Sequence, residues 1–280
     1  MPRNSCEYLH DLGGDLKSPL LHIAHANGFP PGTYLPLATR LAHAYHVVAL
    51  AARPLWHNRS PRDVRTWHTL ADDLIEGLET LEDRVIGVGH SLGGVTTLLA
   101  AVRRPDLFRA VVLLDAVLLP PRWLALLVWA RRLRIPWRPP LVKAALRRRR
   151  VWPSREAAIE YLREKSFFAS WQDAALRAYV ESGTHPTAGG QVELVYPPEW
   201  EAHLFATVPT DVWRFVPRLS SDLPTLFVRG ERSTTFRPKA LVRAVQMLPH
   251  ARFVILSNAG HMFPLERPAE TASYLCAFLA

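Results

Sequence analysis

The chain has 280 residues, of which 49% are apolar, so it can bury a sizeable core and is not a disordered protein. Its net charge of +9 comes from one segment. Residues 122–155 hold eleven Lys or Arg and no Asp or Glu, while acidic residues slightly outnumber basic ones in the rest of the chain. The first residues lack the apolar region of a signal peptide, and no apolar stretch is long enough to span a bilayer, so we expect a cytoplasmic protein.

Short β-rich runs alternate with helical patterns along the chain. Residues 6–9 and the glycines at 13 and 14 predict an antiparallel opening hairpin. The strands expected after it are 20–24, 46–51, 85–89, 110–114, 225–229 and 253–256, and the expected helices are 35–44, 70–81, 240–248 and 269–279. This alternation predicts an α/β fold, a mostly parallel sheet with flanking helices.

A sharp turn with a serine at its apex lies between an expected strand and an expected helix. Gly89-His90-Ser91-Leu92-Gly93 follows the apolar run 85–88 and precedes the helix-compatible run 95–102. Glycines two residues either side of Ser91 leave room for a strained backbone that Cβ atoms would crowd. The helix N-terminus favours negative charge that develops near the serine Oγ. The pattern predicts a nucleophilic serine, and a plain turn with a surface serine is the alternative.

With this strand, turn and helix, the sequence resembles the α/β-hydrolase fold family of serine hydrolases. The resemblance covers most of the chain, and it implies that residues 1–116 and 217–280 form the hydrolase core. It weakens over 117–216, where the family inserts a variable helical cap that roofs the substrate pocket. Two Pro-Pro pairs in this segment, at 120–121 and 139–140, predict that it is broken into short helices.

A serine hydroxyl is a poor nucleophile at neutral pH unless a neighbouring base takes its proton. Of the twelve histidines, His261 follows the expected strand 253–256 and precedes the last helix. The family takes its base from this kind of loop, so the resemblance implies that His261 is the base. His90 adjoins Ser91, but the alternation of side chains along a strand predicts that it packs beside the nucleophile instead.

The resemblance also implies an acid that orients the histidine. Many relatives carry an aspartate three residues after the glycine that ends the preceding strand, but here that position is Ser233, which cannot supply a negative charge. We assign Asp115, at the end of strand 110–114, because some members of the family carry their acid there and the chain order serine, acid, histidine is kept. Glu231 is the second candidate. A turn cap is the non-catalytic alternative for Asp115.

Acyl transfer also needs two backbone N–H groups that point at the oxyanion. Leu92, directly after the nucleophile, is expected to supply one. Asn27 is expected to supply the other, because His25-Ala26-Asn27 follows strand 20–24 and resembles the family's His-Gly-X oxyanion loop, with alanine in place of glycine. His25 is expected to anchor this loop by hydrogen bonds. A plain tight turn is the alternative for a loop so rich in Pro and Gly.

Tryptophans interleave with the arginines of the basic segment 122–155. Three interpretations are open: a solvated surface, an interfacial segment that contacts anionic lipid, and a site for an anionic partner or substrate. The lipid interpretation rests on Trp123, Trp129, Trp137 and Trp152. A nucleic-acid partner is not expected, because no RNA- or DNA-binding module accompanies the basic run 147–150.

Together these features predict a serine hydrolase that cleaves a carboxylic ester or related acyl bond of a small, apolar substrate through an acyl-enzyme. A thioesterase or a carbon–carbon bond hydrolase would use the same machinery. A catalytically silent binding protein is the alternative from another class, suggested by the serine at 233. No cofactor or metal is expected, and Cys6 and Cys276 lack metal-ligand spacing and are expected to be ordinary apolar residues rather than a disulfide.

Overall fold

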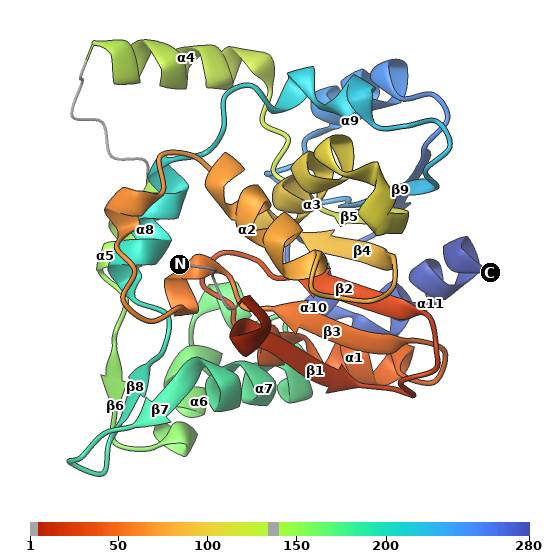
Figure 1. The fold of residues 1–280 in the computed structure, drawn as a ribbon. Helices are drawn as coiled ribbons and strands as arrows, with labels where there is room; N and C mark the ends of the chain where they lie inside the picture. The colour runs from red at the N-terminus through yellow and green to blue at the C-terminus, as the bar shows by residue number, and fades with distance from the viewer. Residues whose placement is uncertain (1–4, 134–139) are drawn as a thin grey trace.

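A seven-stranded sheet forms the centre of the molecule (Figure 1). The structure is a computed structural model that describes residues 5–133 and 140–280. The strand order is β1-β3-β2-β4-β5-β9-β10, and every neighbouring pair is parallel except β1 with β3. The strands are β1 (Leu9–Gly13), β2 (Leu20–Ala24), β3 (His46–Leu50), β4 (Val85–His90), β5 (Phe108–Leu114), β9 (Thr225–Gly230) and β10 (Arg252–Leu256). The predicted mostly parallel α/β sheet is confirmed.

The predicted opening hairpin is wrong. Ser5–Tyr8 forms a short 3-10 helix, and β1 pairs antiparallel with β3, so that Leu9 lies opposite Leu50. β1 does not pair with the next strand along the chain, because both edges of β2 are occupied by β3 and β4. All residues of β2 are buried, as is typical of a central strand covered on both faces.

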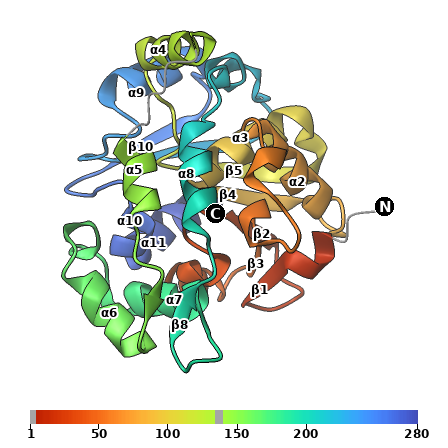
Figure 2. The same ribbon diagram turned by 90° about the vertical axis from the view of Figure 1, so that its left-hand side faces the viewer.

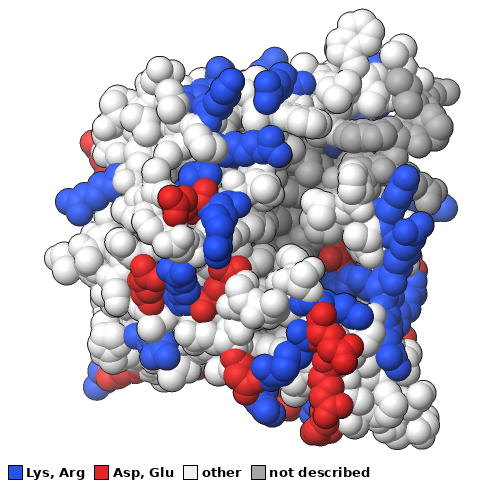
Figure 3. All heavy atoms as spheres, turned by 180° about the vertical axis from the view of Figure 1, so that it is seen from behind, with Lys and Arg blue, Asp and Glu red and all other residues white. Residues whose placement is uncertain are grey.

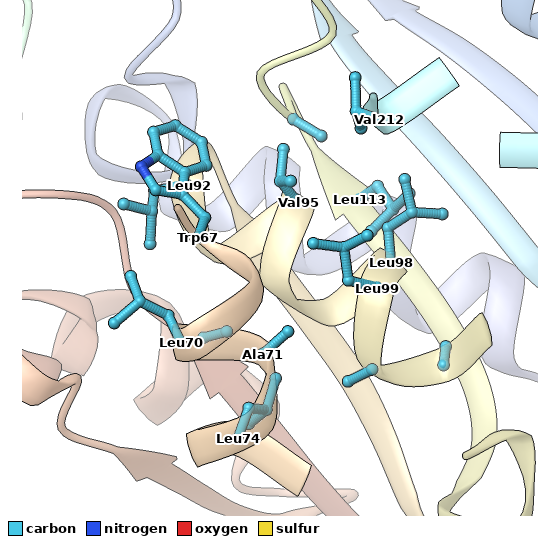
Figure 4. Close-up of a cluster of buried hydrophobic side chains, with 14 of the residues drawn as sticks. Trp67, Leu70, Ala71, Leu74, Leu92, Val95, Leu98, Leu99, Leu113 and Val212 are labelled. Carbon is cyan, nitrogen blue, oxygen red and sulfur yellow. The ribbon is translucent and has the colours of Figure 1, made fainter. Parts of the chain in front are cut away.

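Helices cover both faces of the sheet (Figure 1). α2 (His68–Leu78), α3 (Leu92–Arg103) and α9 (Pro238–Met247) pack on one face, and α1 (Leu35–Leu41), α10 (Phe263–Glu266) and α11 (Pro268–Leu279) on the other. Figure 4 shows the apolar contact between α2 and α3, made by Trp67, Leu70, Ala71 and Leu74 with Leu92, Val95, Leu98 and Leu99. Burying a leucine side chain stabilises a fold by about 2 kcal/mol. This contact therefore fixes the helix that begins directly after Ser91.

The chain leaves the sheet after β5 and returns at β9, and we call residues 117–216 in between the insertion. Its helices are α4 (Pro121–Arg132), α5 (Pro140–Leu146), α6 (Arg155–Arg163), α7 (Asp173–Gly183) and α8 (Pro198–Ala206). It also holds a small antiparallel sheet of β6 (Val151–Trp152), β8 (Val192–Leu194) and β7 (Thr184–Pro186), which the sequence analysis did not predict. Strands of two or three residues are too short to show an alternating pattern.

The insertion packs against both faces of the core. In Figure 1 its elements run along one side of the molecule, from α4 at the top to β6, β7 and β8 at the bottom, and Figure 2 views that side directly. Trp200 and Leu204 of α8 join the apolar cluster that contains α2 and α3, while Trp152 and Tyr179 join the cluster that contains α1 and α11. The Trp67 indole donates a hydrogen bond to the carbonyl of Leu204 (2.9 Å).

None of the helices in the described part of the chain combines the length and the apolar character needed to cross a membrane. Cys276 is a free thiol, and the side chain of Cys6 lies outside what the structure describes.

Candidate active site

Four predicted site residues, together with Ser233, follow five strands that are neighbours in the sheet. In the order β2, β4, β5, β9 and β10, the segments after these strands carry Asn27, Ser91, Asp115, Ser233 and His261. Because the five strands are parallel, their carboxyl ends meet at the same edge of the sheet. Ligand sites of open α/β sheets lie at that edge. The topology therefore gathers residues that are far apart in the sequence.

Ser91 occupies a strained turn between β4 and α3. Its φ of 57° and ψ of −113° lie outside the regions that residues with side chains normally adopt. A Cβ atom on Gly93 would lie 2.0 Å from the carbonyl oxygen of Ala24, and one on Gly89 would lie 2.3 Å from the carbonyl oxygen of Gly93. A side chain at either glycine would clash with the backbone, so both glycines are required for the strained turn, as the sequence pattern predicted.

A line of hydrogen bonds joins Ser91, His261 and Asp115. The Nε2 atom of His261 lies 2.9 Å from the Oγ of Ser91, and its Nδ1 atom lies 2.5 Å from an Oδ2 of Asp115. A carboxylate only accepts hydrogen bonds, so Nδ1 carries the ring proton and Nε2 faces the serine hydroxyl as an acceptor. The carboxyl group is fully buried, whereas the imidazole is 25% exposed. The arrangement can move the serine proton onto an imidazole that a buried carboxylate holds in place.

Three donors surround the carboxylate of Asp115. The Gly230 N–H donates to Oδ1 (3.2 Å), and both the Ser233 hydroxyl and the His261 imidazole donate to Oδ2. A buried carboxylate is tolerated only when such bonds replace the water it loses. Ser233, which stands where the resemblance expects the acid, therefore donates to the carboxylate of Asp115, the candidate acid after the neighbouring strand.

Glu231, the second candidate for the acid, is engaged elsewhere. Its Oε2 atom accepts a hydrogen bond from the backbone N–H of Asn258 (2.7 Å), and the residue is exposed. The Nδ1 atom of His261 is already bonded to Asp115. Of the two carboxylates, the geometry favours Asp115.

The loop after β2 lies beside the serine and is held rigidly. Leu92 is the first residue of α3, where a backbone N–H has no acceptor within the helix, and neither its N–H nor that of Asn27 is bonded to another described residue. The side-chain amide of Asn27 donates to the carbonyl of Glu201 and accepts from the hydroxyl of Tyr196, each at 2.9 Å. Fixed N–H groups without partners are what oxyanion binding requires.

Sequence reasoning missed an ion pair behind this loop. The guanidinium of Arg148 pairs with the carboxylate of Glu201 and donates to the hydroxyl of Tyr179. A Cβ atom on Gly28 would lie 3.0 Å from the Cδ of Glu201, so the pair contacts the loop directly. Burial raises the pKa of the Glu201 carboxyl, and Arg148 opposes this effect. These partners come from different elements of the insertion, so no local pattern marks them.

The family of the chain follows from its similarity to known proteins. The sequence profile of the alpha/beta hydrolase family matches residues 20–274, which is most of the chain. The chain belongs to the alpha/beta hydrolase family. The resemblance inferred from the elbow motif is thereby confirmed.

This hydrolase is similar to curated and solved members of the family over nearly its whole length. It is 25% identical to the 2-(acetamidomethylene)succinate hydrolase of Mesorhizobium japonicum over 268 residues, which cover 93% of this chain and 88% of the relative. The crystal structure of E-2-(acetamidomethylene)succinate hydrolase superposes with a TM-score of 0.77 at 24% identity, covering 97% and 94% of the two chains. The thioesterase domain from the curacin biosynthetic pathway superposes with a TM-score of 0.71 at 20% identity, covering 96% and 93%. These superpositions show a shared fold.

In this hydrolase His90 belongs to a buried chain of hydrogen bonds. Its Nε2–H donates to the carbonyl of His261 (3.0 Å), so its Nδ1 accepts from the hydroxyl of Tyr34 (2.7 Å), which in turn accepts from the N–H of Ala26 (3.0 Å). The chain joins the loop after β2 to the loop that carries His261. Both ring nitrogens of His90 are occupied, so it does not compete for the serine proton. No pattern in the sequence indicated the role of Tyr34.

Two further buried histidines support the strand ends. Both ring nitrogens of His25 are bonded to backbone groups at 2.9 Å, which confirms the anchoring expected of it. His22 accepts a hydrogen bond from the N–H of Leu50 (2.9 Å). Burial, which disfavours the charged imidazolium, lowers the pKa of His22 and of His90 to about 3 and that of His25 to about 4.

We expect the hydrolase to lose stability as the pH falls from about 6.5 towards 4. The folded pKa values of His22, His25 and His90 lie below the ordinary value of 6.5, so each histidine takes up a proton on unfolding in this range. The stability is fully present above pH 6.5, and at pH 5 each of the three lowers the free energy of unfolding by about 2 kcal/mol. Urea unfolding at pH 7, 6 and 5 measures how the free energy of unfolding changes with pH. The variant His185→Gln, at an exposed histidine, should leave it unchanged. A free energy of unfolding that stays constant over this range contradicts the prediction.

Proposed function

We propose that this hydrolase cleaves a carboxylic ester or a related acyl bond through an acyl-enzyme on Ser91. The observation that carries the proposal is the line of hydrogen bonds from Asp115 through His261 to Ser91. In this proposal Ser91 is the nucleophile, His261 the general base and Asp115 the group that orients the base. Thioesters fall within the same class of acyl bond.

The first half of the proposed reaction transfers the acyl group. The proton of the Ser91 hydroxyl passes to Nε2 of His261 while Oγ forms a bond to the carbonyl carbon of the substrate. The carbonyl oxygen becomes an oxyanion that accepts hydrogen bonds from the N–H groups of Leu92 and Asn27. Imidazolium then returns the proton to the leaving oxygen or sulfur as that bond breaks. The negative charge of Asp115 stabilises the imidazolium between the two transfers.

The second half repeats the same steps with water as the nucleophile. His261 takes a proton from the water, whose oxygen attacks the acyl carbon, and the oxyanion forms again beside Leu92 and Asn27. Ser91 then leaves as the bond between its Oγ and the acyl carbon breaks, and it regains a proton from His261. The products are a carboxylic acid and the free serine.

We propose that the substrate is small, that its acyl group is apolar and that the insertion roofs its pocket. Aromatic side chains of the insertion pack on Phe29, two residues after Asn27: the ring centroids of Phe167, Trp171 and Tyr179 lie 6.1, 5.5 and 5.2 Å from that of Phe29. Pockets for small ligands in proteins are lined mainly by apolar and aromatic groups. This cluster supports an apolar acyl group next to the oxyanion site.

An acyl substrate that carries its own carboxylate is the second candidate. The relative from Mesorhizobium japonicum is named as a hydrolase of a succinate derivative, and this chain holds the guanidinium of Arg148, which pairs with Glu201, beside Gly28 in the oxyanion loop. In this candidate the substrate carboxylate shares Arg148 with Glu201. The two candidates differ in their response to substrate charge. A preference for p-nitrophenyl hemisuccinate over p-nitrophenyl butyrate, expressed as kcat/KM, would favour the anionic substrate.

Two measurements on the native protein test the proposal. We expect it to hydrolyse at least part of a chain-length series of p-nitrophenyl esters and to react covalently with a fluorophosphonate, which phosphonylates activated serines. Mass spectrometry of the tryptic peptides should locate the adduct on Ser91. Labelling of Ser91 without ester turnover would leave acyl transfer to another substrate class, such as thioesters. Absence of both labelling and turnover would support a silent binding protein and contradict the proposal.

A further inference from the structure

Helix α4 presents apolar side chains to the solvent. Of its residues only Leu124 is buried. Leu126 is 52% exposed and Trp129 is 65% exposed, and Leu133, directly after the helix, is 60% exposed. Figures 1 and 2 both show α4 at one extreme of the molecule. A single exposed leucine is ordinary in a soluble protein, but three large apolar side chains on one short element form a patch.

The exposed side chains share one face of the helix. Arg122, Leu126, Trp129 and Leu133 follow one another at spacings of four, three and four residues, which align side chains along a single stripe. The buried Leu124 lies on the opposite side. The helix is therefore apolar both towards the protein and away from it, whereas a surface helix in water normally turns a polar face outward. An apolar stripe on the outward face is typical of a helix whose outward face contacts another molecule or a membrane.

Exposed cations without a carboxylate partner lie on α4 and on or directly after α5, the next described helix along the chain. Three of the eleven basic residues in segment 122–155 are neutralised inside the protein, because Arg148, Arg150 and Arg155 pair with Glu201, Glu199 and Glu181. A second group of exposed basic residues forms no ion pair with any residue that the structure describes, namely Arg122, Arg132, Lys143 and Arg147. Arg122 and Arg132 lie on α4, Lys143 lies on α5 and Arg147 directly follows α5. In Figure 3, which views the molecule from behind, Lys and Arg side chains gather along the right-hand edge, on the side where Figure 1 places α5. Two of the four unpaired cations, Arg122 and Arg132, therefore belong to α4 itself.

We propose that the outward face of α4 docks on an anionic lipid surface. Such a surface offers both an apolar layer for Leu126 and Trp129 and negative headgroups for Arg122 and Arg132, and tryptophan favours the boundary between the two. At 12 residues the helix is about 18 Å long, too short to span the apolar layer of a bilayer, so it lies in the plane of the interface.

The structure narrows the segment that the sequence suggested for lipid contact. Trp152 is 2% exposed and packs in the core with Tyr161, so it does not contribute. Trp137 lies outside the described residues. Trp123, 41% exposed, lies beside the stripe on α4. The candidate surface is therefore one helix rather than the whole basic segment.

Sedimentation with vesicles tests the proposal. The full-length protein should co-sediment with vesicles of phosphatidylcholine that contain 30% phosphatidylserine, and much less with pure phosphatidylcholine. Binding should weaken as the salt concentration rises, because salt screens the charges. Each basic side chain near such a surface strengthens binding by about fivefold, so Arg122→Gln with Arg132→Gln should lower the partition coefficient by about 25-fold. Leu126→Ser with Trp129→Ser should lower it by at least tenfold.

A matched pair of variants controls for general effects of charge and polarity. Leu16 and Lys17 are an exposed leucine and an exposed lysine on the turn after β1, and Figures 1 and 2 show β1 well away from α4. Leu16→Ser with Lys17→Gln should bind vesicles like the native protein. All variants replace exposed side chains, and urea unfolding checks that each is folded.

Three outcomes would overturn the proposal. The first is no binding of the native protein to the anionic vesicles. The second is a loss of binding in the arginine variant but none in the Leu126 and Trp129 variant, which indicates attraction to any polyanion. The third is a molar mass by light scattering of twice the 31.6 kDa of one chain that returns to 31.6 kDa in the Leu126 and Trp129 variant, which would assign the face to a second copy.

Discussion

Ser91→Ala should lower kcat on the best p-nitrophenyl ester by at least about ten-thousandfold. The change removes the only atom that forms the bond to the acyl carbon in the proposed mechanism, and loss of the serine in other enzymes of this type has effects of this size or larger. The substitution removes one buried hydroxyl and adds no atom, so the fold should be kept. Initial rates at saturating ester, corrected for the spontaneous reaction, measure the effect.

A serine on α11 provides the control. Ser273 is exposed and its hydroxyl bonds only the carbonyl of Ala269, one turn earlier, so Ser273→Ala should keep kcat within about twofold. Retention of more than a tenth of the native kcat in Ser91→Ala would exclude an acyl-enzyme on this residue. The fluorophosphonate adduct should be absent from the Ser91→Ala variant and present in the Ser273→Ala variant.

Asp115→Asn should lower kcat by about ten-thousandfold. An amide at this position offers the histidine no negative charge and can turn its N–H towards Nδ1, which favours the wrong tautomer of His261. Asparagine tolerates the positive φ of 44° that the backbone adopts here, so the strand end should keep its shape. The pH profile of kcat/KM provides a second readout, because an imidazolium without its carboxylate is less stable. The matched change Glu231→Gln should leave kcat within a few-fold, and the reverse pattern would assign the acid to Glu231.

A second substitution, at Ser233, is expected to restore part of the activity lost in Asp115→Asn. The Ser233 hydroxyl contacts the oxygen of Asp115 that also accepts the hydrogen bond from His261, so a carboxylate at 233 would lie close to the imidazole. We expect the double variant Asp115→Asn with Ser233→Asp to have a kcat at least tenfold higher than that of Asp115→Asn alone. The Ser233 Oγ accepts hydrogen bonds from the backbone N–H groups of Thr235 and Phe236, and an aspartate oxygen can accept them too. A double variant as inactive as Asp115→Asn would contradict this expectation.

Local patterns in the sequence were enough to predict the fold class and four of the five residues that the sheet edge gathers, namely Asn27, Ser91, Asp115 and His261. The contact of Ser233 with Asp115 appears only in the structure. The elbow around Ser91 combines a buried strand, two glycines and a helix, and each of these is visible within about 20 residues. His261 and Asp115 follow apolar strands that the sequence also marks. Their proximity follows from the parallel arrangement, because residues after neighbouring parallel strands share one edge.

Contacts between distant elements could not be predicted in the same way. The bonds from Tyr34 to His90 and from Asn27 to Glu201 join residues 56 and 174 positions apart, and the sequence next to each residue does not indicate which partner it has. The pairing of β1 with β3 depends on which strand edges remain free once the sheet is assembled. Whether an arginine of the basic segment is neutralised depends on carboxylates that follow it by 26 to 53 positions.

The hydrogen bonds between the insertion and Asn27 limit how new substrate specificities can arise in this fold. Tyr196 and Glu201 hold the amide of Asn27, and Arg148 holds Glu201, so the same segment that would shape the pocket also fixes the loop assigned to the oxyanion. A chimaera that exchanges residues 117–216 for those of a relative would therefore change binding and rate together. To change the pocket alone, an engineered insertion should keep Tyr196, Glu201 and Arg148 and exchange the residues around them. Natural divergence of the insertion is restricted in the same way.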